Sequence, residues 1–413
     1  MARSGMRSPE IPNGALYAMN TLKQAGFEAV LVGGCVRDMI MGKIPDDYDI
    51  ATSALPEETL RVFEKDRTIP TGIKHGTVTL VRDGQPYEIT TYRIDGEYTD
   101  MRRPDNVTFT RTLEQDVLRR DFTINALAWD SEKGIIDFVG GQGDIRRHLI
   151  RTVGKPEKRF SEDALRIYRA LRFASRLGFA IDCETSQSLI RLSGNTAHLA
   201  AERVYSEYTK ILRGQYAHTV IAHYESVLRK HISCEKTISA SSWQMAAELI
   251  SDVRDKEDTI LLWACLLVNA GPAGAADALA SLKADTHTLQ GVCAVIGAAM
   301  RPPEDDYALR CLIGDMGEET ARRAIWLGLR DDKIKRDMML AKLDEIMHKG
   351  LPCTIASLAI GGEELSRLGL KGKTIGETLR MLLDCVRADL IPNTKESLLQ
   401  RAEEYLQGDQ GKK

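Results

Sequence analysis

Three acidic side chains, Asp47, Asp49 and Glu88, have the types and spacing of a metal site for phosphate chemistry. If the segment around Asp47 is extended, Asp47 and Asp49 point to one face, because side chains alternate along a strand. Neighbouring carboxylates repel each other unless a cation lies between them, and hard divalent ions prefer such oxygen ligands. Taken alone, residues 46–50 are more simply explained as a solvated acidic turn. Glu88, in a Thr-rich and apolar run, adds a third carboxylate, and together the three support a two-metal site for in-line phosphoryl transfer.

A pair of glycines, Gly33 and Gly34, follows the apolar run at residues 29–32. A strand that runs into two glycines and then a short helix lets a phosphate approach the backbone, with helix N–H groups and Arg37 directed at it. A plain strand-to-helix turn is the simpler explanation of the glycine pair alone. The pattern is therefore a candidate anion cradle.

A second candidate group lies in the run RRDFTINALA at residues 119–128. Arg120 offers a rigid fork of donors that suits triphosphate oxygens. Asp121 and Asn125 are expected to lie one helical turn apart, where they could hold sugar hydroxyls. A surface helix with capping charges explains this run equally well.

Residues 161–173 are expected to form a helix in which Asp163 and Arg166 are i,i+3 neighbours. Ser161 could cap this helix, and acidic residues near its start favour the positive end of the helix dipole, so a structural explanation is available. Held side by side, however, a carboxylate and a guanidinium match the donor and acceptor groups of cytosine and adenine. They leave mismatched groups against guanine and uracil. One pair of side chains could therefore select two bases.

The elements that must position these side chains change in character near Gly154. Before it, β-rich runs occur at residues 29–32, 77–82 and 87–92, and the last two are joined by Asp83-Gly84, a hairpin turn pair. Beyond it, helical periodicity dominates. The sequence therefore predicts an α+β fold, with a strand-containing head followed by a long all-helical remainder.

Length and composition agree with a multidomain globular protein. The chain has 413 residues, of which 43% are hydrophobic and 28% charged, and this length predicts about two to four domains. The apolar runs, such as residues 260–268, are shorter than the ~18–20 residues needed to cross a bilayer, and no signal pattern is present. Eight cysteines without a CxxC pair, mostly among apolar neighbours, are expected to be buried free thiols. We therefore expect a cytoplasmic chain.

The charge pattern permits a nucleic-acid partner despite a net charge of −3. Residues 101–180 hold 16 Lys and Arg against 11 Asp and Glu, so the central region is basic while the rest is acidic. Aromatic residues make up only 6% of the chain, which is too few for an extended base-stacking platform. Contacts to RNA are therefore expected to rely on phosphates.

The motifs GGCVRD, DDYDIAT, EITTYR, RRDFTINALA and EDALRIYRALRF occur in this order. Each is weak alone, but together they resemble the class II tRNA nucleotidyltransferases, the CCA-adding enzymes of the polymerase-beta-like superfamily. The resemblance is dense over residues 29–212 and returns at 375–399, whereas residues 215–350 match only as a helical body.

This resemblance implies a nucleotidyltransferase head with a mixed sheet at residues 1–150 and a helical neck for base recognition at 151–214. It further implies a helical body at 215–350 and a helical tail that binds tRNA at 351–413. It implies Mg²⁺ held by Asp47 and Asp49, with Glu88 as the third acidic position. The other residues implied to contact the nucleotide are Gly33, Gly34, Arg37, Arg120, Asp121, Asn125, Glu162, Asp163, Arg166, Arg169 and Arg172.

Residues 96–105 resemble the flexible loop of the same family, and the residues singled out in it are Gly96, Arg102, Arg103 and Asp105. Because the segment has no apolar face, we expect it to be mobile in the free enzyme. Its predicted role is to shift the base-selecting pair between C addition and A addition.

Three functions remain open from the sequence. The first is a full CCA-adding enzyme that uses CTP and ATP to extend the tRNA 3′ end and that contacts the acceptor and T arms. Such an enzyme is expected to have no membrane partner and to be a monomer or a homodimer. The second is a partial enzyme that adds only A or only CC, or a poly(A) polymerase; residues 138–144 and the near-neutral tail weigh against the latter. The third is an RNA-binding protein without chemistry, which would have no use for three clustered carboxylates.

Overall fold

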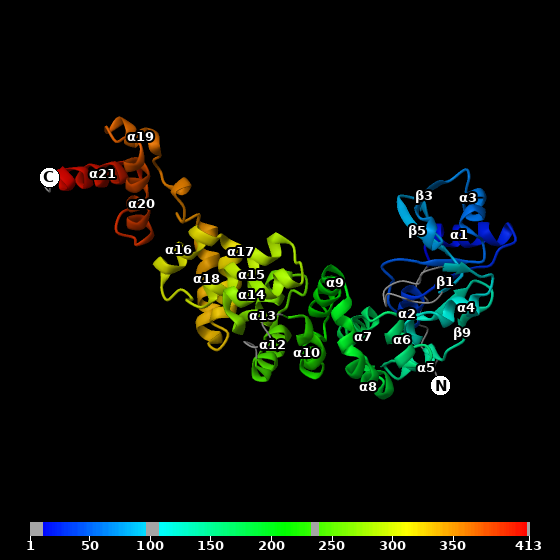
Figure 1. Ribbon diagram of the computed structural model, residues 1–413. Helices are drawn as coiled ribbons and strands as arrows, with labels where there is room; N and C mark the ends of the chain where they lie inside the picture. Colours follow the sequence, from blue (N-terminus) through cyan, green and yellow to red (C-terminus); the bar gives the residue numbers. More distant parts are fainter. Residues whose placement is uncertain (1–10, 96–106, 233–238, 411–413) are drawn as a thin grey trace, which may run out of the picture. The chain divides into compact units, whose positions relative to one another are not determined.

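The computed structural model describes residues 11–95, 107–232 and 239–410, and its contacts divide the chain into two compact units, Met1–His231 and Ile232–Lys413 (Figure 1). The first unit holds a seven-stranded mixed sheet followed by helices. The described part of the second unit is helical. The predicted α+β fold, a mixed-sheet head followed by helices, is thereby confirmed.

The sheet has the strand order β3-β4-β5-β2-β1-β8-β9. Strand β2 pairs antiparallel with β1 and parallel with β5, which makes the sheet mixed. All four residues of β1 are buried, so this central strand lacks the polar alternation of a half-exposed strand. The strands are β1 (Ala29–Val32), β2 (Ile50–Thr52), β3 (Arg67–Gly72), β4 (Thr77–Arg82), β5 (Gln85–Thr91), β8 (Leu127–Asp130) and β9 (Gly134–Asp137).

The predicted hairpin is present between β4 and β5. Asp83 and Gly84 both have positive φ, 52° and 77°, which is the conformation that a two-residue turn between twisted strands needs. The run predicted at 77–82 coincides with β4, and β5 starts two residues before the run predicted at 87–92. Local turn chemistry therefore sets the register that places Glu88.

Helices cover the sheet and continue beyond it within the first unit (Figure 1). Helix α7 is amphipathic: Ile167, Tyr168 and Leu171 are buried, and the helix packs on α9 and α10. The helices are α1 (Asn13–Gln24), α2 (Gly34–Ile40), α3 (Pro56–Val62), α4 (Leu113–Leu118), α5 (Gly141–Arg146), α6 (Pro156–Glu162), α7 (Leu165–Leu177), α8 (Cys183–Leu192), α9 (Ala201–Leu212), α10 (Ala217–His223) and α11 (Glu225–Leu228).

Short elements connect the sheet of this unit with the helices that follow it in the chain. A 3₁₀ turn, η2 (Thr123–Asn125), precedes β8, and the parallel pair β10 (Leu149–Ile150) and β11 (Ala180–Ile181) ties the end of the head to the segment after α7. A second short pair consists of β6 (Arg93–Asp95) and β7 (Val107–Phe109). The predicted loop residues Gly96, Arg102, Arg103 and Asp105 fall between β6 and β7 and lie outside the described residues.

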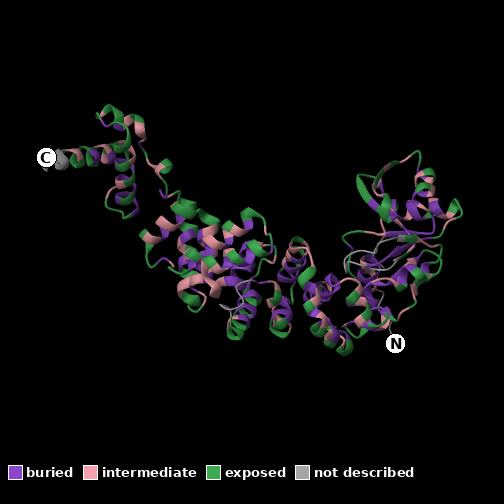
Figure 2. Ribbon diagram, in the orientation of Figure 1, coloured by how far each residue is buried: buried purple, intermediate pink, exposed green. Residues whose placement is uncertain are grey.

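The second unit buries the inner faces of its helices (Figure 2). Within the described ranges, Thr259–Ser281 is apolar and long enough to cross a membrane, but the 3₁₀ turn η5 (Val268–Ala270) separates its two α-helices, and half of its most apolar window is buried. The helices are α12 (Ala240–Asp252), α13 (Thr259–Leu267), α14 (Gly271–Ser281), α15 (Thr286–Ala299), α16 (Asp306–Met316), α17 (Glu318–Gly328), α18 (Lys333–Lys349), α19 (Gly362–Arg367), α20 (Lys373–Arg387) and α21 (Lys395–Gln410). The seven described cysteines of the chain are free, as predicted, but the expected burial is wrong for three of them: Cys183 is exposed, and Cys293 and Cys311 are half-buried.

Candidate active site

A cavity of about 830 Å³ in the first unit gathers the predicted site residues. It is lined from the ends of β1 and β2, from β5, from the segment around η2 and from α7. Of the predicted residues that the structure describes, Glu162 is the one that does not line it. Those that do are Gly33, Gly34, Arg37, Asp47, Asp49, Glu88, Arg120, Asp121, Asn125, Asp163, Arg166, Arg169 and Arg172.

The sheet register brings the carboxylates together. Ile50 pairs with Ile89 in the parallel ladder of β2 and β5, so Asp49, directly before β2, and Glu88, one residue before Ile89, are neighbours on the opposite face. The Asp49 carbonyl accepts a hydrogen bond from the Val32 N–H at 3.0 Å, which extends the pairing with β1 and holds this segment. Glu88 is exposed on the cavity side, not buried in an apolar run as its neighbours suggested.

The charge at this end of the cavity is unbalanced. Burial, followed by the carboxylates of Asp47 and Glu88, raises the pKa of Asp49 to about 6, and the guanidinium of Arg120 opposes this shift. Within residues 11–95, 107–232 and 239–410, no three His, Cys, Asp or Glu side chains form a ready metal cluster. The repulsion felt by Asp49 nevertheless fits a divalent cation, because such an ion would offset it with oxygen ligands already facing one cavity.

Gly33 makes room for an arginine at the glycine pair. Its φ of 83° belongs to the left-handed region, and a Cβ atom at this position would lie 3.3 Å from Nη1 of Arg120. A larger residue would therefore be strained and would crowd the guanidinium. Gly34 begins α2, so the predicted strand–glycine–helix arrangement is confirmed.

Arg37 differs from the expectation that its donors point at a phosphate. Its side chain is 4% exposed, and its Nε and Nη2 atoms donate to the two carboxylate oxygens of Asp38 at 2.8 and 2.9 Å. Its Nη1 atom donates to Oδ1 of Asn125 at 2.7 Å. Arg37 therefore holds Asn125 in the cavity wall.

Asp121 and Asn125 do not lie on one helix, because Asp121 precedes the short turn η2. The Asp121 carboxylate accepts from Nε of Arg169 at 2.7 Å and from the Phe122 N–H at 2.8 Å. Burial acts to raise the pKa of Asp121, but the Arg169 guanidinium outweighs it and holds that pKa below its usual range. Asp121 is thus an ionised group that fixes Arg169 on α7.

The expected single helix at residues 161–173 is wrong. Helix α6 ends at Glu162, Asp163 has an extended backbone with φ −143° and ψ 103°, and α7 starts at Leu165. Ser161 lies inside α6 and caps nothing. Sequence periodicity missed this break because both sides of it are helical.

The two predicted base-selecting residues therefore approach the cavity from different elements. Oδ1 of Asp163 accepts from the Leu165 N–H at 2.9 Å, and its Oδ2 lies 3.7 Å from Nη2 of Arg203. Burial raises the pKa of Asp163, and these two partners oppose the shift. Arg166 donates to Oε2 of Glu162 at 2.6 Å, so Glu162 supports Arg166 from outside the cavity.

Sequence reasoning missed several charged residues of the site. Asp116, fully buried, accepts from Arg119 and Arg120 at 2.7 and 3.0 Å and from the Arg93 N–H at 3.2 Å. Its position three and four residues before the arginine pair was a signal that could have identified it. Arg176 and Arg203 also line the cavity, and only tertiary structure places them there.

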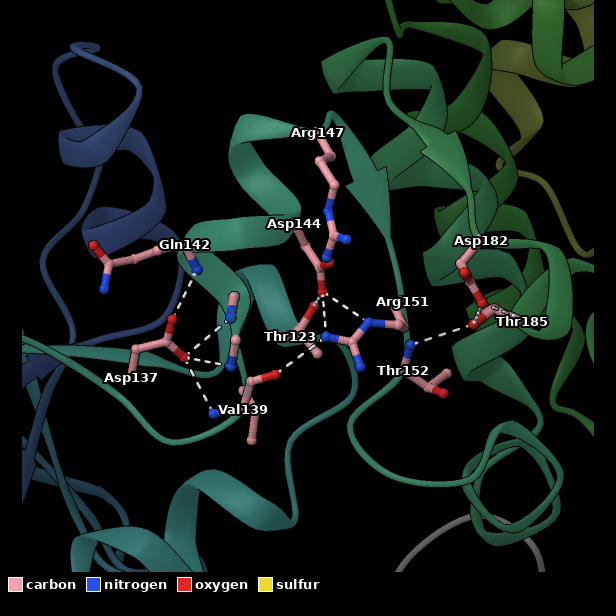
Figure 3. A network of polar contacts seen from close by, with 12 residues as sticks. Thr123, Asp137, Val139, Gln142, Asp144, Arg147, Arg151, Thr152, Asp182 and Thr185 are labelled. Atoms are coloured by element: carbon pink, nitrogen blue, oxygen red, sulfur yellow. Dashed lines mark hydrogen bonds and ion pairs between the residues drawn. The ribbon is translucent and has the colours of Figure 1, made fainter.

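A buried polar network supports the wall that carries Asp121 and Asn125 (Figure 3). Asp144, with no exposed surface, accepts from Thr123 Oγ1 at 2.6 Å, from Arg147 at 2.7 Å and from Arg151 Nε at 2.9 Å. Because Thr123 starts η2, this network fixes the turn that presents Asn125. The adjoining backbone is tied in turn by the pairing of Phe122 with Thr152.

Comparisons with known proteins identify the families and enzymes that this chain resembles. The family described as "Poly A polymerase head domain" matches residues 29–151, and the family described as "Probable RNA and SrmB- binding site of polymerase A" matches residues 178–225. The CCA-adding enzyme of Geobacillus stearothermophilus is 52% identical over 203 residues, which is 49% of this chain and 50% of that enzyme. The CCA-adding enzyme of Leuconostoc mesenteroides is 36% identical over 395 residues, which is 94% of this chain and 95% of that enzyme.

Solved structures of similar proteins cover almost the whole chain. The CCA-adding enzyme of Bacillus stearothermophilus, in complex with CTP, superposes with a TM-score of 0.79 at 32% identity and covers 97% of this chain and 98% of that one. The Thermotoga maritima CCA-adding enzyme, complexed with tRNA, has a TM-score of 0.74 at 21% identity and covers 97% of both chains. At that identity the second likeness shows the fold alone.

Proposed function

The chain belongs to the family of CCA-adding enzymes, which are nucleotidyltransferases, and from this premise we propose that it adds CCA to the 3′ end of tRNA. The substrates are CTP and ATP, and diphosphate is released. The single observation that carries this proposal is the cavity in which Asp47, Asp49 and Glu88 face arginines from α7 and from the segment before η2. Carboxylates at one end and guanidinium groups along one wall suit a triphosphate and a nucleophile.

In this mechanism Asp47 and Asp49 hold Mg²⁺, and Glu88 is the third acidic group. The bound metal supplies activation of the tRNA 3′-hydroxyl and charge for the transition state. The chain itself contributes a fixed scaffold: the β2–β5 ladder keeps Asp49 beside Glu88, and the bond from Val32 keeps the Asp49 backbone in line with β1. The raised pKa of Asp49 supports this assignment, because a group that resists ionisation when alone gains most from a cation.

The nucleotide lies between the glycine turn and α7. Gly33, Gly34 and Arg120 face the triphosphate. Asn125 and Asp121 lie beside the ribose, and Arg37 holds Asn125 in place. Two further arginines on α7, Arg169 and Arg172, also contact the nucleotide.

Base selection rests on Asp163 and Arg166. The Asp163 carboxylate accepts from the exocyclic amine of cytosine or adenine, and Arg166 donates to the neighbouring ring nitrogen. Glu162 holds the guanidinium, since the two are 2.6 Å apart across the break between α6 and α7. Guanine and uracil present a carbonyl where cytosine and adenine present the exocyclic amine. Asp163 and Arg166 would then be left without matching hydrogen-bond partners.

The proposed domains of the chain are the head at 1–150, the base-recognising neck at 151–214, the body at 215–350 and the tail at 351–413. The tail binds the acceptor and T arms of the tRNA, and the enzyme works in the cytoplasm. The basic surplus at residues 101–180 supports phosphate contacts near the head and neck. The loop at 96–105 shifts the base-selecting pair between C and A.

A primer experiment tests this function. Purified protein is incubated with Mg²⁺ and with tRNA that ends at the discriminator base, at C, or at CC, and CTP and ATP are supplied separately and together. A full CCA-adding enzyme extends the first two with CTP and the third with ATP. Addition of A to the CC end alone would identify an A-adding enzyme, CC addition without the final A a CC-adding enzyme, and long A tails a poly(A) polymerase. No addition to any primer would overturn the assignment.

A further inference from the structure

Helix α7 contributes a row of arginines to the cavity, and the last of them differs from the others in its ion-pair partner. Arg166, Arg169, Arg172 and Arg176 are three or four residues apart, so they share one face, and all four line the cavity. The row covers about 15 Å of helix, from the base-selecting end toward the carboxylates. Each arginine forms an ion pair with an acidic side chain.

The partner of Arg176 is the exception. The carboxylates that hold the first three arginines are mostly buried, with side-chain exposures of 17% for Glu162, 10% for Asp121 and 8% for Glu207. Arg176 pairs at 2.9 Å with Asp46, whose side chain is 82% exposed and lies directly before Asp47. The first three pairs are fixed by packing, whereas the fourth is held by a contact that a ligand can displace.

We propose that Arg176 binds the phosphate groups of the incoming nucleotide, and that Asp46 is the counter-ion that occupies this arginine between turnovers. An exposed ion pair contributes little to stability, whereas arginine binds phosphate oxygens through two parallel charge-assisted hydrogen bonds. Displacement of Asp46 by a phosphate is therefore favourable. Arg176 also lies at the end of the row where the triphosphate must meet the metal-binding carboxylates.

The electrostatics of the row agree with an anion site. Burial lowers the pKa of Arg172, and the nearby positive charges of Arg169 and Arg176 lower it further, although Glu207 opposes them. These arginines thus lie close enough to repel one another. An added anion between Arg172 and Arg176 relieves that repulsion.

Two single variants have opposite expected effects, which a merely structural ion pair would not produce. Arg176→Gln removes the phosphate ligand, so the dissociation constants of CTP and of inorganic pyrophosphate rise on the order of tenfold. Asp46→Asn removes the competitor, so both constants fall by about two- to fivefold. The preference for C and A over U and G stays as in the parent protein in each variant.

The double variant Asp46→Asn/Arg176→Gln separates competition from a general effect of charge. If Asp46 acts by occupying Arg176, the double variant binds CTP and pyrophosphate as weakly as Arg176→Gln alone. If Asp46 acts through its general negative charge, the double variant binds both more tightly than Arg176→Gln. Arg191→Gln is the matched control, since Arg191 has a side-chain exposure of 59% and pairs with Glu157 outside the cavity. CTP and pyrophosphate binding of this control equal those of the parent protein.

Because the inference rests on the proposed function, binding is measured by calorimetry without tRNA, beside the primer assay. Weaker CTP and pyrophosphate binding in Arg176→Gln and tighter binding in Asp46→Asn support the inference, even if the primer assay gives a different product. Weaker CTP and pyrophosphate binding in both variants, or unchanged binding in Arg176→Gln, overturns the inference. CCA addition by the parent protein in the primer assay would still leave the proposed function intact. Thermal melting of each variant verifies that it is folded.

Discussion

Arg166 and Glu162 form an ion pair of 2.6 Å across the break between α6 and α7, so the guanidinium of the proposed base reader is held by the residue before Asp163 and not by Asp163 itself. Glu162 also accepts from Arg159 at 2.9 Å. Glu162 therefore acts as a positioning residue, and Asp163 lines the cavity with its carboxylate next to the Leu165 N–H and Arg203.

Replacing Glu162 by Gln tests this division of roles. The variant loses a charge-assisted bond of roughly 1.5–3 kcal/mol, so kcat/KM for CTP and for ATP should both fall by about ten- to hundredfold. Glu157→Gln, in the same helix but paired with Arg191, is the matched control and should keep the parent rates. If Glu162→Gln retained the full rates with both nucleotides, the supporting role would be refuted.

Replacing Asp163 by Ala should affect selectivity. Loss of the acceptor for the exocyclic amine should relax discrimination against UTP and GTP by about 1–3 kcal/mol per lost contact. Single-nucleotide incorporation with each of the four nucleoside triphosphates measures this. A uniform fall in all four rates would show instead that Asp163 only caps the start of α7 through the Leu165 N–H.

Asp49→Asn should stabilise the metal-free protein at neutral pH while abolishing nucleotide addition. The folded-state pKa of Asp49 is raised from 3.8 to about 6, so the stability associated with its protonated form is present below pH 4 and is lost as the pH rises through 6. In EDTA, the variant should therefore be more stable than the parent at pH 8, by on the order of 1–3 kcal/mol, and equal to it near pH 3.5. Denaturant unfolding at the two pH values gives the comparison, and a less stable variant at pH 8 would contradict it.

Asp116→Ala should cause the opposite pH dependence. Burial acts to raise the pKa of Asp116, but Arg120 and Arg119 outweigh it and hold that pKa below 3.8. Its contribution is therefore present above pH 4 and lost as the pH falls through the folded-state pKa. Removing this buried partner of two arginines should cost about 3 kcal/mol at pH 7, and the difference should shrink toward pH 2.

Glu114→Gln, an exposed change on the same helix α4, is the control for that series. Its urea unfolding curve should match the parent within about 0.5 kcal/mol. If Asp116→Ala lost the same unfolding free energy at pH 7 and at pH 2, the contribution of Asp116 would come from packing and not from its charge.

The sequence by itself determined the elements that depend on local patterns. Strand β4 and the Asp83-Gly84 turn follow from side-chain alternation and from the need for positive φ, both of which are properties of a few adjacent residues. The glycine turn at Gly33 follows from the same kind of local constraint. The ordered motifs also identified residues that the structure gathers in one cavity.

Only the tertiary structure decided which charged groups meet. Asp46 and Arg176 are 130 residues apart in the chain, and Arg37 is 88 residues from Asn125, so no periodicity relates either pair. The break at Asp163 escaped prediction for a related reason: its extended backbone is compatible with contacts to Leu165 and Arg203, while the flanking residues favour helix on both sides. Local propensity specifies elements, but the partner of a buried charge depends on which other elements the fold brings within hydrogen-bonding distance.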